Sequence, residues 1–293
     1  MHSIEEKRVY GDRSGAVEAY VASSVGVVRV RVAGDTVGEF GLCDRCDARD
    51  VAATRTGTKA GVAIATDEDI RVLDATPAAE SADERADDPT FVDTGFGPAV
   101  AVGYDGETLL AADASGRIAR RVGDEWTTLA DDAIETVTAI DGDLVGTGSG
   151  VYRVRDDELD HAGLTDVRDV SAAGVPLAAT ADGLYKLGNG WMTIREGSVD
   201  VVAADPRSDR NQLGRAHAVA DRTVYAHDPA DGEWQAMDGP DETVVGIDYG
   251  ETVYAVSERG TFYAAIDGDG PGTWRSQTIG VGDVTGIAVP GTR

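Results

Sequence analysis

The sequence predicts an all-β protein: a seven-bladed β-propeller made of four-stranded blades. Three observations favour this fold class. A short apolar unit repeats along the 293 residues, and such a repeat is typical of propellers and other repetitive folds. Small and aromatic side chains fall on different strands of each unit. The strands at the two ends of the chain complete each other to form one more blade.

The repeat is clearest at the corner between the second and third strands of each unit. Successive corners lie 33 to 47 positions apart, which fits the about 40–50 residues of a propeller blade. Glycine supplies the positive φ that a tight hairpin turn requires. The two corners without glycine are therefore expected to have different loops. The corner residues in chain order are Gly26, Asp69, Gly116, Gly150, Gly183, Arg222 and Gly260.

Each unit also contains one strand rich in small side chains, which we expect to line the propeller axis, where strands crowd together. These inner strands lie around Val51, Val100, Val137, Val170, Val202, Val245 and Ile287. Aromatic side chains are expected farther out, where the space between blades widens. The tryptophans fall on expected fourth strands and four tyrosines on expected third strands: Trp126, Trp191, Trp234, Trp274, Tyr152, Tyr185, Tyr225 and Tyr263.

The two ends of the chain are expected to share one blade. The last inner strand, near Ile287, is followed only by a few residues, whereas the strands of residues 17–43 have no inner partner. Joining them completes a seventh blade and removes open sheet edges. We therefore predict a single domain over residues 1–293. Within it, residues 1–16 are expected to form an N-terminal arm or an edge strand, and the acidic stretch 76–89 a flexible loop.

The composition is strongly acidic, with 53 Asp and Glu against 26 Lys and Arg and a formal net charge of −27. This balance is typical of proteins that work in molar salt, where the Debye length is about 3 Å and like charges repel weakly. It lacks the basic footprint of nucleic-acid binding. The N-terminus does not resemble a secretory signal, and no stretch reaches the roughly 20 apolar residues of a membrane span. We expect a cytoplasmic monomer with no membrane or nucleic-acid partner.

One pair of cysteines, Cys43 and Cys46, has the C-x-x-C spacing at which two thiolates bind zinc or exchange a disulfide. A four-ligand zinc site needs two further ligands, and the four histidines are scattered along the sequence. The strand-to-helix context of redox motifs is also missing. We favour two small loop residues packed between blades. A zinc or redox site, including a zinc ion shared by two chains, is the alternative.

The connections into the inner strands carry a ring of acidic residues. In a propeller these connections gather at one mouth of the central channel, where carboxylates could bind Ca²⁺, Mg²⁺ or a basic partner. We favour a plainer interpretation, in which an acid-rich chain has acids in every loop and Arg-Asp pairs join neighbouring blades. The candidate residues are Arg49, Asp50, Asp132, Asp166, Arg168, Asp169, Asp241 and Asp283, with Asp47 and Asp200 in similar positions.

Two turns resemble those of sialidase-like propellers. Residues 267–274 (DGDGPGTW) are similar to an Asp-box turn, and residues 204–213 (ADPRSDRNQL) resemble the loop after the inner strand. Over its full length the acidic chain, with GVVRVRVAGD at residues 26–35, resembles a haloarchaeal family of β-propeller proteins. This resemblance implies a seven-bladed propeller of WD40/YVTN-like type. It brings no active residues, and the catalytic residues of sialidases are not assigned here.

Taken together, these features favour a non-catalytic scaffold that binds a protein or small ligand on one ring face. No Ser-His-Asp arrangement is evident, and no glycine-rich loop precedes a helix, so we expect no cofactor. Two alternatives stay open. One is a hydrolase or lyase that uses a divalent ion such as Ca²⁺ at the channel mouth. The other is a redox or zinc-responsive protein that uses Cys43 and Cys46.

Overall fold

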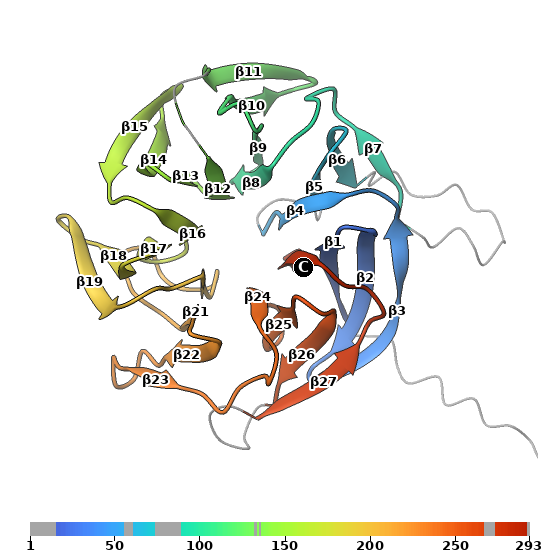
Figure 1. The fold of residues 1–293 in the computed structure, drawn as a ribbon, viewed down its shortest axis with the longest axis vertical. Helices are drawn as coiled ribbons and strands as arrows, with labels where there is room; N and C mark the ends of the chain where they lie inside the picture. The colour runs from blue at the N-terminus through green and yellow to red at the C-terminus, as the bar shows by residue number, and fades with distance from the viewer. Residues whose placement is uncertain are drawn as a thin grey trace, which may run out of the picture.

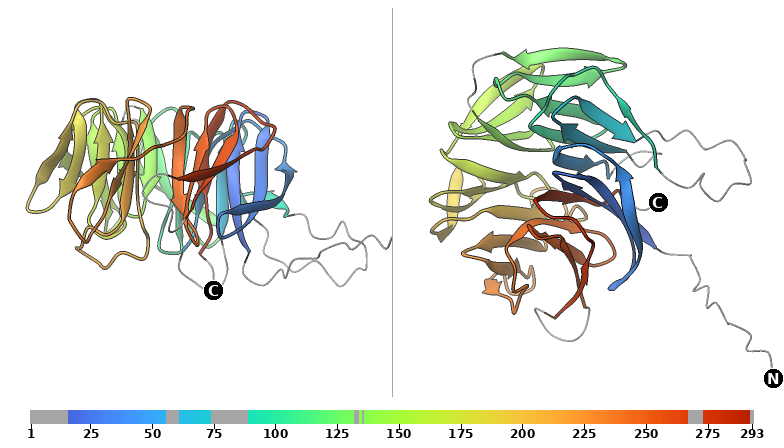
Figure 2. Two further views of the ribbon diagram at one scale, coloured as in Figure 1. Left: turned by 90° about the horizontal axis from the view of Figure 1, so that it is seen from below. Right: turned by 45° about the vertical axis from the view of Figure 1, so that its right-hand side comes forward.

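The computed structural model describes residues 16–55, 61–73, 89–131, 134, 136–266 and 273–291. Their strands form seven antiparallel sheets of four strands each, which are arranged as blades around a central axis (Figure 1). Seen from the side, the blades form a flat ring (Figure 2). The predicted fold class is therefore confirmed. Over these ranges, no helix is long and apolar enough to cross a membrane.

The blades follow the chain in order, and the first strand named in each lies nearest the axis. Blade 1 contains β28 (Val284–Ala288), β1 (Val17–Ser23), β2 (Gly26–Ala33) and β3 (Thr36–Asp44). Blade 2 contains β4 (Ala48–Ala53), β5 (Val62–Thr66), β6 (Ile70–Leu73) and β7 (Phe91–Asp93). Blade 3 contains β8 (Ala101–Asp105), β9 (Thr108–Ala112), β10 (Ile118–Val122) and β11 (Glu125–Ala130).

The remaining four blades repeat this order. Blade 4 contains β12 (Val137–Asp141), β13 (Leu144–Thr147), β14 (Gly150–Arg155) and β15 (Glu158–Gly163). Blade 5 contains β16 (Val167–Ser171), β17 (Leu177–Thr180), β18 (Gly183–Leu187) and β19 (Trp191–Glu196). Blade 6 contains β20 (Val201–Ala204), β21 (Ala216–Ala220), β22 (Thr223–His227) and β23 (Trp234–Ala236). Blade 7 contains β24 (Val244–Tyr249), β25 (Val253–Ser257), β26 (Thr261–Ala265) and β27 (Trp274–Thr278).

Blade 1 joins strands from the two ends of the chain. β28 pairs antiparallel with β1, and Tyr20 lies opposite Ala288 and Val21 opposite Ile287. This pairing confirms the predicted closing blade, and it covers the sheet edge that β1 would otherwise expose. The predicted gradient of side-chain size is also confirmed. The tryptophans lie on the outermost strands β11, β19, β23 and β27, and the four tyrosines on β14, β18, β22 and β26.

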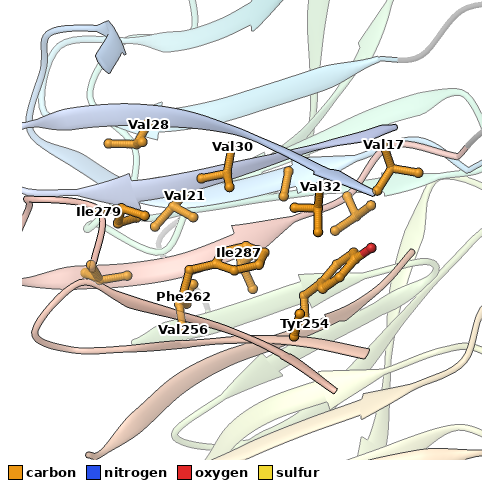
Figure 3. Packing of buried hydrophobic residues seen from close by; sticks show 14 residues of the cluster. Val17, Val21, Val28, Val30, Val32, Tyr254, Val256, Phe262, Ile279 and Ile287 are labelled. Atoms are coloured by element: carbon orange, nitrogen blue, oxygen red, sulfur yellow. The ribbon is translucent and has the colours of Figure 1, made fainter. Parts of the chain in front are cut away.

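The hydrophobic core lies in layers between neighbouring blades. Figure 3 shows the layer between blades 1 and 7, where Val21 and Val30 pack near Tyr254 and Phe262. The rings of Tyr254 and Phe262 lie 5.4 Å apart, centroid to centroid, and both side chains are fully buried. Burying one such side chain contributes about 1.5–3 kcal/mol. Each layer therefore depends on the contact of two neighbouring blades.

Buried hydroxyl groups close the corners between second and third strands in several blades. Thr180 is an example, because its Oγ1 donates to the carbonyl of Gly183 and accepts from the N–H groups of Asp182 and Gly183 at 3.0–3.1 Å. A serine or threonine three residues before the corner residue marks this arrangement in the sequence. Equivalent hydroxyls that donate to a corner carbonyl belong to Ser23, Thr66 and Thr147.

The two corners without glycine differ from the others in distinct ways. The Asp69 carboxylate accepts hydrogen bonds from Ile70, Gly95, Phe96 and Gly97, at N–O distances of 2.7–3.0 Å. It therefore anchors the chain that leaves β7. Asp221 and Arg222 form the corner of blade 6 with left-handed backbones, at φ values of 49° and 65°.

Three predictions concern segments that lie wholly or mostly outside the described residues. They are the arm or edge strand of residues 1–16, the flexible loop of residues 76–89 and the Asp-box-like turn of residues 267–274. The longer connection of blade 6, after the inner strand, is described and runs from Asp205 to Arg215.

Candidate functional site

The candidate site is the central channel, a cavity of about 1110 Å³ that is lined by inner strands of the blades. We call the ring face where the chain enters the inner strands the entry face, and the opposite face, where it leaves them, the exit face. Asp166 and Asp283 precede inner strands on the entry face, and residues 205–215 follow one on the exit face. Of the predicted site residues, the structure brings Asp50, Arg168 and Asp169 to the channel.

Asp50 and Asp169 join neighbouring blades. The Oδ1 atom of each accepts a hydrogen bond from the N–H group of the following valine, at 2.8 Å in both cases. The Oδ2 atom reaches the inner strand of the next blade, where Asp50 binds the N–H group of Val102 at 2.9 Å. Asp169 binds Val202 in the same way at 2.8 Å. These two carboxyl groups thus have the blade-joining role that the sequence interpretation favoured, although backbone N–H groups take the place of arginine.

Asp141 and Asp248, which were not among the predicted site residues, make similar contacts. Asp141 Oδ2 accepts a hydrogen bond from Ala172 N at 2.8 Å, and Asp248 Oδ2 accepts one from Val289 N at 2.7 Å. All four aspartates sit one residue before or one residue after the central aliphatic residue of an inner strand. Those two positions share a face of the strand, so the same contact with the next blade is available from either.

Burial changes the acidity of these carboxyl groups. It raises the pKa of Asp50 and Asp169 to about 7, even though backbone N–H groups oppose the shift. The pKa of Asp141 is also raised, mainly by burial, and the negative charge of Asp248 raises it further. Its side chain is nevertheless open to the water of the channel, which limits the effect. The channel therefore holds carboxyl groups that bind protons more readily than ordinary aspartates.

Most arginines at the channel already have acidic partners. On the entry side, Arg168 forms an ion pair with Asp200 and donates to Ser198 Oγ at 2.6 Å. Toward the exit face, Arg55 forms an ion pair with Asp248 and donates to the carbonyl of Tyr249 at 3.1 Å. Arg168 thus reaches the connection into the neighbouring blade 6, as the Arg-Asp interpretation expected, although its partner is Asp200 and not Asp169 or Asp50. Arg55 follows β4 of blade 2 and reaches blade 7, which is not its neighbour.

The other predicted mouth residues have different surroundings. Arg49 is exposed on β4, and Asp241 lines a smaller recess. Asp166 and Asp283 both have a φ of 50°, immediately before an inner strand. Aspartate tolerates this left-handed conformation better than most residues, which accounts for its presence there without a ligand. Asp132 lies outside the described residues.

Cys43 and Cys46 are free thiols at the contact between blades 1 and 2. The Cys43 thiol donates to the carbonyl of Val27 at 3.2 Å. Burial raises the pKa of Cys43 to about 12 and that of Cys46 to about 11, so both are protonated at neutral pH. This packing agrees with the interpretation of two small residues between blades. Within the described ranges, no group of three or more His, Cys, Asp or Glu side chains is placed to hold a metal ion.

The fold and the channel define a seven-bladed β-propeller whose inner strands are fastened to one another by aspartates that line the channel. A family model for HVO_0234-like beta propellers, named after a haloarchaeal protein, matches residues 3–290. The chain belongs to this family, and the predicted resemblance to haloarchaeal propellers is confirmed. A search of curated protein sequences found no match.

Solved structures with the same fold include WD40 propellers. The WD40 domain of Doa1 is 17% identical, with a TM-score of 0.62, covering 84% of this chain and 90% of that chain. The WD40 domain of Neurospora crassa Pan2 is 10% identical (TM-score 0.56; coverage 82% and 85%). A nidogen/laminin complex contains a chain with 12% identity (TM-score 0.55; coverage 93% and 98%). At these identities the similarity shows the fold alone.

Proposed function

We propose that the protein is a non-catalytic interaction scaffold that binds its partner on the entry face, in a high-salt cytoplasm. The observation that carries this proposal is the role of the channel carboxyl groups. Asp50, Asp141, Asp169 and Asp248 each hold a backbone N–H group of the neighbouring blade. Using them in acid-base chemistry or metal binding would compete with these hydrogen bonds. The exposed side chains of the entry face are free for a partner.

Charge narrows the class of partner. The chain carries a formal net charge of −27, so a polyanionic nucleic acid is repelled at long range. A protein partner with complementary surface charge is favoured instead. Such a surface contact needs no cofactor and no second copy of the chain.

Capture of partners at high salt tests the proposed face. The entry-face variant Arg49→Gln/Asp166→Asn/Asp283→Asn removes three charges, and asparagine keeps the left-handed backbone that two of these positions need. The matched exit-face variant Asp105→Asn/Arg210→Gln changes two exposed side chains on the other side of the ring. Wild-type protein and both variants are immobilised and exposed to a lysate in about 2 M KCl, where long-range charge effects are screened.

We expect the exit-face variant to capture the same proteins as wild type, and the entry-face variant to lose at least one that wild type binds. The entry-face variant must also show wild-type unfolding, so that the loss reflects its surface. Equal capture by all three proteins, or loss by the exit-face variant alone, contradicts the proposal.

A further inference from the structure

A second hollow on the entry face lies away from the channel. It is a recess of about 200 Å³ between blades 6 and 7. Its walls come from the second-to-third-strand corners of both blades and from the connection that enters β24. The residues that line it are Arg222, Asp241, Glu242, Thr243, Glu258 and Arg259.

Both arginines of this recess have hydrogen-bonding capacity to spare. Arg222 donates to the backbone carbonyl of Asp241 at 2.9 Å and pairs with no carboxylate within the described residues. Over the same ranges, Arg259 makes no hydrogen bond and no ion pair. The arginines of the channel differ, since Arg55 and Arg168 each hold an aspartate. In so acidic a chain, two guanidinium groups without carboxylate partners in one hollow indicate a place for an anion.

The backbone of Arg222 supports a role for its side chain. Its φ of 65° lies in the left-handed region, which is strained for residues other than glycine, asparagine and aspartate. Glycine at position 222 would relieve this strain, and the arginine side chain is the part that glycine lacks.

The charges around the two arginines restrict the anion. Guanidinium groups bind carboxylates and phosphates through paired N–H donors. Asp241, Glu242 and Glu258 line the same recess and outnumber its two arginines, so each further negative charge on a ligand adds net repulsion. A singly charged carboxylate therefore suits the recess better than a doubly charged phosphate. The volume admits a group the size of acetate or of a glutamate side chain.

We propose that this recess binds a carboxylate group through Arg222 and Arg259. The carboxylate comes either from a small molecule or from an acidic side chain or C-terminus of a protein partner. The second source would connect the recess with the proposed scaffold role. The inference itself does not depend on that role, because binding of a small carboxylate is measurable even if no protein is captured.

The test is a titration of the full chain, monitored by NMR of the arginine Nε–Hε groups at constant ionic strength. The probes are sodium acetate, acetyl-Gly-Gly with a free C-terminal carboxylate, and the same peptide as its amide. We expect saturable shifts of two arginine signals with acetate and the free peptide and none with the amide. Tighter binding of acetate supports a small-molecule source, and tighter binding of the peptide supports a protein partner. Equal shifts with the amide, or shifts that do not saturate, overturn the proposal.

Two variants connect the binding to the named side chains. Arg222→Gly should weaken carboxylate binding at least about tenfold and at the same time raise the unfolding temperature, since it relieves the left-handed strain. Arg259→Gln should weaken binding similarly without raising the unfolding temperature. Glu258→Gln removes a repelling charge and should strengthen binding a few-fold. Wild-type affinity in both arginine variants contradicts the proposed site.

Discussion

The carboxyl group of Asp169 holds the N–H group of Val202 on the neighbouring blade, at an O–N distance of 2.8 Å. The same oxygen-to-backbone contact recurs between Asp50 of blade 2 and Val102 of blade 3, three blades earlier in the chain. These contacts lie next to the channel, where inner strands of adjacent blades have no ladder of hydrogen bonds between them. The ring is therefore fastened at its centre by side chains.

Replacing Asp169 with asparagine should lower the free energy of unfolding by about 1–3 kcal/mol. The amide retains only one acceptor oxygen, so one of the two N–H groups, that of Val170 or Val202, loses its partner, and a buried unsatisfied donor costs about this much. Chemical denaturation in molar KCl measures the effect. Asp166→Asn, at an exposed position with a left-handed backbone, is the control and should change stability by less than about 0.5 kcal/mol. Equal effects of the two substitutions contradict this account.

The raised pKa values of Asp50 and Asp169 predict how stability depends on pH. Their pKa rises from an ordinary 3.8 to about 7 on folding, so the folded state holds protons that the unfolded state has released. The stabilisation from these two groups is complete below about pH 4 and is lost as the pH rises through 7.

Other groups also change their protonation in this pH range. Burial lowers the pKa of His217 to about 3, so His217 stabilises the fold more as the pH rises, which is opposite to the effect of the two aspartates. The comparison is therefore made against Asp50→Asn/Asp169→Asn, in which only the two carboxyl groups are changed. The stability advantage of wild type over this variant should shrink between pH 5 and pH 8. An advantage that stays constant or grows over that interval rules out the raised pKa values.

Thr180→Val should lower the free energy of unfolding by about 1–3 kcal/mol. The substitution keeps the shape of the side chain, but it leaves the N–H groups of Asp182 and Gly183 without their acceptor. Thr193→Val, on the exposed outer strand β19, is the matched control and should be nearly neutral. Urea or guanidinium titration of both variants gives the comparison. If Thr180→Val left the free energy of unfolding unchanged, water would be the acceptor for these two N–H groups in the variant.

The thiols of Cys43 and Cys46 should react slowly in the folded protein. Burial raises the pKa of both, and the thiolate is the reactive form. At pH 8 we expect alkylation more than about tenfold slower than in denaturant. Elemental analysis of protein purified in molar KCl should also give the same zinc content for wild type and Cys43→Ser/Cys46→Ser. Zinc that disappears in the double variant would establish a thiolate site instead.

Lowering the salt should destabilise the ring. The net charge of −27 is screened over about 3 Å in molar salt but over about 10 Å at 0.1 M, so repulsion within the chain grows as salt is removed. Thermal unfolding should therefore occur several degrees lower in about 0.1 M KCl than in about 2 M KCl. An unfolding temperature independent of KCl would contradict this explanation of the composition.

The sequence permits the fold to be predicted because each blade meets the same packing constraints. Small residues near the axis and tryptophans at the rim recur, so one unit supports the interpretation of the next. The channel contacts were predicted only in part. Asp50 and Asp169 were recognised because each follows arginine and precedes valine. Asp141 and Asp248 follow isoleucine at the end of an inner strand, and the Ile-Asp dipeptide shared by blades 4 and 7 was the available signal.

The recess between blades 6 and 7 could not be predicted from the sequence, for a different reason. Arg222 and Arg259 lie on separate blades, and nothing in a linear pattern shows that their corners face each other. Arg222 was recognised as a departure from glycine. The arrangement of the surrounding loops decides whether an arginine side chain forms an ion pair with a carboxylate. The sequence of a repeat unit does not specify that arrangement.

The pairing of β1 with β28 also has a consequence for synthesis of the chain. About 260 residues separate the two strands, and a ribosome adds about 5–20 residues per second. For about 13–50 s, β1 is therefore outside the ribosome or emerging from it before its neighbour has been made. During that interval its backbone is an open edge that another nascent chain can join. The ring can close only after β28 has been made, and the time until then is a period of exposure to aggregation.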